Sequence, residues 1–237
     1  GFNPGNSLTV NGETGKAIEG STWVTSLVLP LLHQAQAEKR KLEAAAEWLL
    51  RCEGAEGSVI QRFLHAVGKS PVEQDPRLRA WPWRPGNHSW VEPTSHALLA
   101  LAWLQDLAPA AAIKYRRELG EKMLLDRRCV DGGWNYGNKR VLGETLSSYP
   151  ETTALALLGL TQSTAGDLSP SLTAAAHFHH EHTSAYASSL LTLALRLHGK
   201  EVRYQPSTEG IHPSRSVPVA ALEILALSPE PRKAFLP

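Results

Sequence analysis

Two glutamates occupy the same position in a phrase that the sequence repeats. Residues 89–101 read SWVEPTSHALLAL and residues 148–160 read SYPETTALALLGL, so Glu92 corresponds to Glu151, 59 positions further on. Paired carboxylates that face each other across a cavity mouth are the groups a glycosidase or a lyase uses for acid–base catalysis. Glu92 and Glu151 are therefore candidate catalytic residues of an enzyme that acts on a carbohydrate or a lipid.

The same two glutamates also fit a structural role. Ser89-x-x-Glu92 and Ser148-x-x-Glu151 both spell a capping box, in which the serine hydroxyl accepts a backbone N–H and the glutamate returns a hydrogen bond. The negative carboxylate also favours the positive end of a helix. We interpret the repeated phrase first as a repeated helix start, whose glutamates can still face a cavity.

Aromatic residues gather in the loops that lead into these helix starts. The loops AWPWRPGNHSW (80–90), GGWNYG (132–137) and SSYP (147–150) contain four of the seven tryptophans. We expect the rings to converge on one rim and line an apolar pocket, although each ring can instead wedge a turn against neighbouring helices. His96 is either a further site residue or a core histidine. The candidate ligand-binding residues are Trp81, Trp83, Trp90, His96, Trp134, Tyr136 and Tyr149.

The histidines of HFHHEH (177–182) have the spacing of a metal chelate on a helix. His177 and His180, and likewise His179 and His182, are three residues apart, as ligands on one helix face would be. Nothing downstream offers obvious further ligands, and we therefore interpret the segment as a solvated outer face. The sequence predicts no bound metal and no cofactor.

The composition excludes several classes of partner. Twenty-four Lys+Arg against 23 Asp+Glu give a formal net charge of +1. The chain therefore lacks the excess of basic residues that binds the phosphates of a nucleic acid. The longest apolar run, ALLALAWL (97–104), is far short of the roughly 20 residues that span a bilayer, so we expect no transmembrane segment. Cys52 and Cys129 lack disulfide-framework or zinc-site spacing and are expected to be buried thiols. The compartment is left open, with a soluble cytoplasmic protein slightly favoured, and a protein partner or self-association remains open too.

The repeated phrase belongs to a longer alternation of segments. Five segments are apolar nearly all round and are predicted to be inner helices, buried on most sides: 21–32, 89–101, 148–160, 186–197 and 217–227. Three segments have one charged face and are predicted to be outer helices: 37–53, 111–129 and 171–182. The short KEVRYQ (200–205) is the main strand signal, and a strand there would be marginal. The layout predicts an all-α fold of hairpins packed side by side, in a small or incomplete ring.

Parts of the sequence resemble a known family. DGGWNYG (131–137) followed by YPETTALALLGL (149–160), together with SWVEPTSHALLAL after a Trp-rich loop, looks like the prenyltransferase/squalene cyclase repeat. The resemblance implies an α/α toroid, that is, a small or incomplete α/α barrel of inner and outer helices with a cavity at one end. We accordingly expect a single toroid domain over residues 1–237, with residues 1–19 forming an extended N-terminal arm.

The catalytic motifs of that family are missing from the chain. Its five aspartates form neither DxDD nor DDxxD, and neither cysteine belongs to the Asp-x-Cys pair that binds zinc in protein prenyltransferases. Because proteins of one fold can have different functions, the resemblance does not by itself imply a reaction. We expect a terpenoid cyclase/prenyltransferase-like toroid that binds an apolar or isoprenoid-like ligand or serves as a domain of a larger assembly. The alternatives are the enzyme that uses Glu92 and Glu151, and a protein-interaction scaffold.

Overall fold

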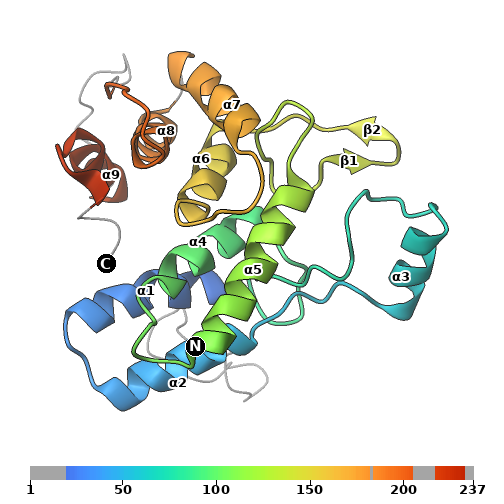
Figure 1. Ribbon diagram of the computed structural model, residues 1–237, viewed down its shortest axis with the longest axis horizontal. Helices are drawn as coiled ribbons and strands as arrows, with labels where there is room; N and C mark the ends of the chain where they lie inside the picture. The colour runs from blue at the N-terminus through green and yellow to red at the C-terminus, as the bar shows by residue number, and fades with distance from the viewer. Residues whose placement is uncertain (1–19, 182–183, 205–216, 233–237) are drawn as a thin grey trace, which may run out of the picture. The chain divides into compact units, whose positions relative to one another are not determined.

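Helices dominate the protein, which confirms the all-α prediction (Figure 1). The computed structural model describes residues 20–181, 184–204 and 217–232, so the predicted arm at 1–19 lies outside the described residues. The helices in these ranges are α1 (Thr22–Gln34), α2 (Lys39–Arg51), α3 (Val59–Ala66), α4 (Val91–Leu101), α5 (Ala110–Arg127), α6 (Pro150–Gly159), α7 (Ser169–His180), α8 (Ala185–Leu197) and α9 (Val217–Leu227). All the predicted inner and outer helices form, and α3 is a helix that the sequence analysis missed.

Strands in the described ranges are limited to a short hairpin. Strand β1 (Arg140–Val141) pairs antiparallel with β2 (Glu144–Thr145). Residues 200–204, the described part of the marginal strand signal at 200–205, form no strand. This segment instead passes α9, where the Tyr204 hydroxyl donates to Glu223 Oε1 at 2.6 Å.

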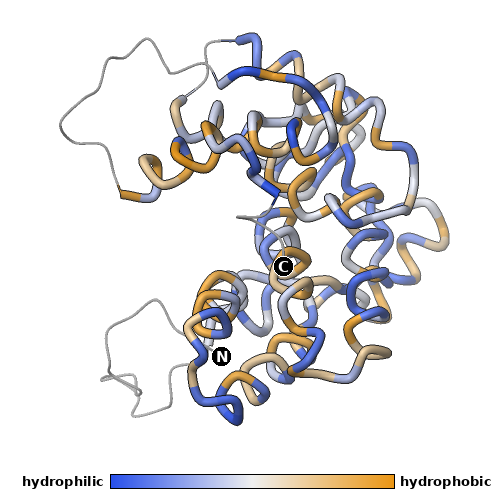
Figure 2. Tube along the Cα trace, turned by 60° about the vertical axis from the view of Figure 1, so that its left-hand side comes forward, coloured by the Kyte–Doolittle hydropathy of each residue, from blue (hydrophilic) through white to orange (hydrophobic). Residues whose placement is uncertain are grey.

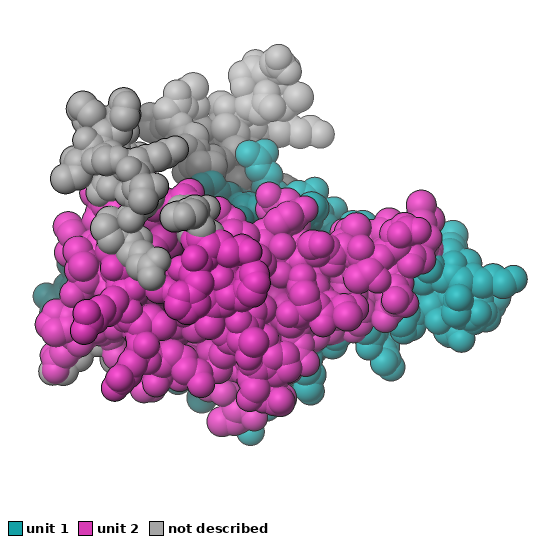
Figure 3. Space-filling view, turned by 90° about the horizontal axis from the view of Figure 1, so that it is seen from above, with its two compact units in different colours: residues 1–70, 75–123 teal, residues 71–74, 124–237 magenta. Residues whose placement is uncertain are grey.

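The chain divides into two compact units (Figure 3). The first unit comprises Gly1–Ser70 and Asp75–Met123, and the second comprises Pro71–Gln74 and Leu124–Pro237. Helix α5 contributes residues to both. Each unit is described by itself below, and the expectation of one toroid domain over residues 1–237 stays a prediction.

In the first unit, the inner helices α1 and α4 pack together and run parallel. At their N-terminal ends, the Thr22 N–H donates to the carbonyl oxygen of Trp83, in the loop that leads into α4, at 3.2 Å. At their C-terminal ends, His33 Nε2 lies 3.0 Å from Oδ1 of Asp106, just beyond α4. The outer helix α2 packs on α1 and buries apolar residues at helical spacing, such as Leu42.

In the second unit, α6, α8 and α9 form a row of parallel inner helices. His198 Nε2, at the end of α8, lies 2.8 Å from the Leu157 carbonyl oxygen near the end of α6. Arg196 Nη1 of α8 donates to the Ala226 carbonyl oxygen near the end of α9 at 2.8 Å. The outer helix α7 packs on both α6 and α8. In each unit, successive inner helices are thus parallel neighbours, as a repeat of hairpins requires.

Burial differs among the inner helices. Eight of the 11 residues of α4, eight of the 10 of α6 and ten of the 13 of α8 are buried. The prediction of burial on most sides is wrong for α1 and α9, which expose Leu27, Leu31, Val217, Ile224 and Leu227. Helix α9 packs chiefly on α8 among the described helices of its unit, whereas α6 and α8 are also covered by the outer helix α7. Figure 2 colours the trace by hydropathy, and hydrophobic residues recur along its helices.

The Gly-Gly-Trp turn before α6 has no room for other residues. Gly132 has a φ of +92°, which disfavours other residue types, and a side chain there would meet the backbone of Pro170. A Cβ on Gly133 would collide with the hydroxyls of Ser148 and Thr153. Both glycines are therefore needed to bring Trp134 against the start of α6.

Candidate functional site

Two of the candidate tryptophans are fully buried and join an outer helix to the next inner helix. The indole N–H of Trp81 donates to the carbonyl oxygen of Leu49, in the last turn of α2, at 2.9 Å. The indole N–H of Trp134 donates to the carbonyl oxygen of Leu124, in the last turns of α5, at 2.6 Å. The last carbonyl groups of a helix lack partners within the helix, and each indole donates to one of them. The Leu49 carbonyl also accepts the Cys52 N–H at 3.3 Å. These observations support the packing interpretation for Trp81 and Trp134.

The backbone of each buried tryptophan is held by the inner helix that follows. The Trp81 N–H donates to Thr94 Oγ1 at 3.2 Å, and the Trp134 N–H donates to Thr153 Oγ1 at 2.9 Å. The residue before each helix, Trp90 or Tyr149, in turn donates its N–H to the carbonyl oxygen of the buried tryptophan. The repeated phrase therefore encodes one repeated joint between loop and helix.

The predicted capping boxes do not form. Helix α4 begins at Val91 with Trp90 as its N-cap, and Ser89 lies one position too early to cap it. Ser89 instead donates its N–H to Glu56 Oε1 at 2.5 Å and its hydroxyl to Glu56 Oε2 at 3.1 Å. Glu56 is almost fully buried. The sequence analysis missed this carboxylate because it lies 33 residues away from its partner.

The second unit repeats the arrangement with an aspartate. Tyr149 is the N-cap of α6 and makes no side-chain cap bond, so Ser148 is again one position early. The Ser148 N–H donates to Asp131 Oδ2 at 3.0 Å. In both units the carboxylate that holds the helix start comes from the turn after the preceding outer helix, which is α2 for Glu56 and α5 for Asp131. Neither Glu92 nor Glu151 is used for this purpose.

Glu92 and Glu151 are consequently half-buried acids in the first turn of their helices. Glu92 Oε1 lies 3.8 Å from Nε2 of His96, one turn along α4, so a carboxylate and an imidazole adjoin at this helix start. Glu92 belongs to the first unit and Glu151 to the second. Their use as an acid–base pair stays a prediction.

Three further tryptophans of the first unit, Trp23, Trp83 and Trp90, lie at the N-terminal ends of α1 and α4. Trp83 and Trp23 meet edge to face, with ring centroids 5.9 Å apart. Trp90 caps α4, and all three side chains are half-buried. We call Trp23, Trp83 and Trp90, with the neighbouring Glu92 and His96, the tryptophan rim. Trp23 was not among the candidates, although it stands at the start of the first apolar segment.

In the second unit, the corresponding helix start carries a tyrosine pair. The rings of Tyr136 and Tyr149 have centroids 5.3 Å apart and an interplanar angle of 48°. Both side chains are exposed. The candidates of this unit therefore separate into one buried indole, Trp134, and two accessible phenols.

The histidine segment is only partly the solvated face that was expected. His177 and His180 are exposed. His179 is buried instead, with Nε2 3.2 Å from Thr192 Oγ1 on α8, and burial, assisted by the charge of His180, lowers its pKa. His182 lies outside the described residues. No group of three or more His, Cys, Asp or Glu side chains among the described residues could hold a metal ion.

Both cysteines are buried free thiols, as expected. Burial raises the pKa of Cys52 to about 12 and also raises the pKa of Cys129. Both groups therefore stay in the unreactive thiol form at neutral pH.

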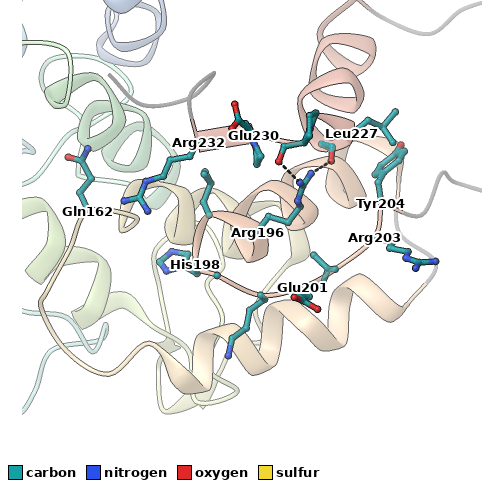
Figure 4. A pocket seen from close by; sticks show the side chains of 16 residues that line it. Gln162, Arg196, His198, Glu201, Arg203, Tyr204, Leu227, Glu230 and Arg232 are labelled. Atoms are coloured by element: carbon teal, nitrogen blue, oxygen red, sulfur yellow. Dashed lines mark hydrogen bonds between the residues drawn. The ribbon is translucent and has the colours of Figure 1, made fainter.

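A pocket that the sequence did not predict lies in the second unit, at the C-terminal ends of α8 and α9. It has a volume of about 1680 Å³. Figure 4 shows Arg196 in its wall, with hydrogen bonds to the chain at the end of α9. Other charged residues that line it are Lys200, Glu201, Arg203, Glu230 and Arg232. No sequence signal pointed here, because the segment was interpreted as a marginal strand.

Comparisons with known proteins found no counterpart. No family model matches the chain, and neither a curated protein nor a solved structure matches it. None of the helices in the described ranges is both long enough and apolar enough to cross a membrane.

Proposed function

We propose that the chain is an α/α toroid of the prenyltransferase/squalene cyclase type. Parallel inner helices in each unit support this architecture, as do the outer helices that connect them. The repeated joint of Trp81 with Thr94 and of Trp134 with Thr153 is the local feature that such a repeat would preserve.

The toroid binds an apolar, isoprenoid-like ligand at the tryptophan rim. The observation that carries this function is the accessible aromatic surface of Trp23, Trp83 and Trp90 at the N-terminal ends of α1 and α4. Indole faces offer apolar area, and ligand sites are typically apolar with a few polar groups. The Glu92 and His96 pair would provide the polar part, for a hydroxyl or another polar end of the ligand.

Native mass spectrometry tests this function directly. The purified chain is incubated with a total lipid extract, cleared of free lipid and measured under conditions that keep it folded. We expect a retained mass of an isoprenoid or similar apolar lipid, and a reduced amount in Trp83→Ala. The bare protein mass alone, from protein that remains folded, would reject the function.

A role as a domain of a larger assembly is the second candidate. It is favoured by the uncovered apolar residues of α1 and α9, including Leu31 and Ile224. Exposed apolar surface of this kind often marks a protein interface. Sedimentation velocity at increasing concentration should then show association that Ile224→Lys weakens, whereas a wild-type monomer throughout would argue against self-association. An enzyme that uses Glu92 and Glu151 remains an alternative.

A further inference from the structure

Helix α3 exposes an apolar face to solvent. None of its residues is buried, and Figure 1 shows it apart from α1, α2 and α4, which belong to the same unit. The exposed fractions are 84% for Val59, 72% for Ile60, 64% for Phe63 and 47% for Val67. Helical spacing places these four side chains on one face. A cluster of uncovered apolar residues on one helix indicates a surface that binds something.

Local interactions hold α3 in its helical form. Ser58 Oγ accepts the Gln61 N–H at 3.2 Å, and Gln61 Oε1 accepts the Ser58 N–H at 3.1 Å, which completes a capping box. Gly68, with a φ of +67°, lies just beyond the other end. Isolated helices this short are marginal in water, and these end interactions favour the helix. The apolar face is therefore formed before any partner arrives.

The opposite face of α3 is basic. Arg62 and His65 are three residues apart on α3, Lys69 follows just beyond its end, and residues 57–70 contain no Asp or Glu. The next acidic residue along the chain, Glu73, is already held in ion pairs. Asp75 interacts electrostatically with His65, and Arg62 and Lys69 leave the segment with an excess of positive charge beside its apolar face. Its complement is an apolar layer bordered by negative charge.

We propose that α3 is an interfacial helix that docks the protein on a membrane surface containing anionic lipid. A bilayer supplies both parts of the complement, since the apolar side chains enter the acyl boundary while Arg62 and Lys69 meet anionic headgroups. A two-turn helix about 12 Å long offers far less than the roughly 800 Å² per partner of a stable protein interface. The proposal is independent of the ligand function proposed above.

Vesicle co-sedimentation of the full chain tests the apolar contact. The wild type should sediment with vesicles of phosphatidylcholine and phosphatidylglycerol, and only weakly with phosphatidylcholine alone. The triple variant Val59→Ser, Ile60→Ser, Phe63→Ser should lose this binding. Because those side chains are exposed, its urea midpoint should match the wild type. The control replaces three exposed apolar residues elsewhere, Val130, Val217 and Leu227, with Ser and should bind like the wild type.

A charge variant and a label test the orientation of the helix. Arg62→Gln with Lys69→Gln should weaken binding by about thirtyfold at low salt, since each basic residue near the surface contributes about fivefold. Lys39→Gln with Arg51→Gln on α2 is the matched control. An environment-sensitive dye on Phe63→Cys should shift to the blue on anionic vesicles, and the same dye on Val130→Cys should not.

Three results would overturn the proposal. They are a wild type that stays in solution with anionic vesicles, a triple variant that sediments as the wild type does, or a dye on Phe63→Cys that reports an unchanged environment. The first result, from protein that remains folded, would point to an apolar groove of a protein as the occupant of this face.

Discussion

Glu56, not Glu92, is the carboxylate that fixes the start of α4. Removing it in Glu56→Ala leaves the buried N–H and hydroxyl of Ser89 without their acceptor, and we expect a loss of about 2 kcal/mol or more of unfolding free energy. Glu92→Gln removes only a charge near a helix end and should cost about 0.5 kcal/mol or less. Urea denaturation of both variants measures the difference. Equal losses for the two would restore the capping-box interpretation.

The buried indoles make a similar residue-level claim. Trp81→Phe keeps an aromatic ring but removes the indole bond to the Leu49 carbonyl, which then keeps only the longer bond from the Cys52 N–H at 3.3 Å, so the unfolding free energy should fall by about 2 kcal/mol. Trp134→Phe should behave alike, because its N–H is bound in the same way. Trp48→Phe, at a half-buried position of α2, is the control and should cost about 1 kcal/mol or less. An effect of the control as large as the other two would mean that ring size matters and the hydrogen bond does not.

His179 should make the stability depend on pH. Burial holds its pKa below the ordinary value of 6.5, so the unfolded chain binds a proton at a higher pH than the folded chain does. The contribution is therefore complete above pH 6.5 and is lost as the pH falls toward the folded pKa. His179→Gln, which cannot titrate, should flatten the unfolding free energy between about pH 7 and about pH 5. The exposed His177→Gln should leave the slope as it is, and an unchanged slope in His179→Gln would contradict the account.

At the scale of elements, Arg196 couples α8 to α9. Its Nη1 donates to the carbonyl oxygens of Ala226 and Ser228 at 2.8 and 2.7 Å. Arg196→Met keeps the apolar stem and removes these bonds, so amide exchange in α9 should accelerate by about tenfold or more while α6 stays protected. Lys200→Met is the matched control on the following loop. Unchanged exchange in α9 would show that its apolar contacts with α8 suffice.

Most elements could be predicted from the sequence because they are repeated. The repeated phrases at 89–101 and 148–160 have a helical length and a common start. Burial against parallel neighbours favours the Ala and Leu residues that they contain. Helix α3 was not predicted because it is short, with 8 residues, although Val59, Ile60 and Phe63 have the spacing of one helix face. The exposure of one side of α9 was not predicted for a different reason, because the sequence alone does not tell which helix stands at the end of a row.

The candidate site was less predictable than the elements. Residue type located the aromatic side chains in the loops before α4 and α6, but burial separated Trp81 and Trp134 from the accessible Trp83, Trp90 and Tyr149. That separation depends on how each ring meets the preceding outer helix. Contacts between distant residues, such as Glu56 with Ser89, cannot be read from spacing within a motif.

At the scale of the whole molecule, we propose a toroid-type protein with an aromatic binding rim and without the DxDD, DDxxD and zinc motifs. The central proposal is that the tryptophan rim binds an isoprenoid-like ligand. A defined isoprenoid alcohol, farnesol, is a suitable probe because it is uncharged and requires no metal.

Isothermal titration of the full chain with farnesol tests this claim most directly. We predict saturable binding with a negative heat-capacity change, the mark of buried apolar surface. Trp83→Ala and Trp90→Ala should each weaken binding by at least about tenfold, as loss of a central aromatic anchor does, while Trp48→Ala, outside the rim, should bind as the wild type does. Folded wild-type protein that gives no binding heat at several temperatures, or equal affinity in all four proteins, would contradict the claim.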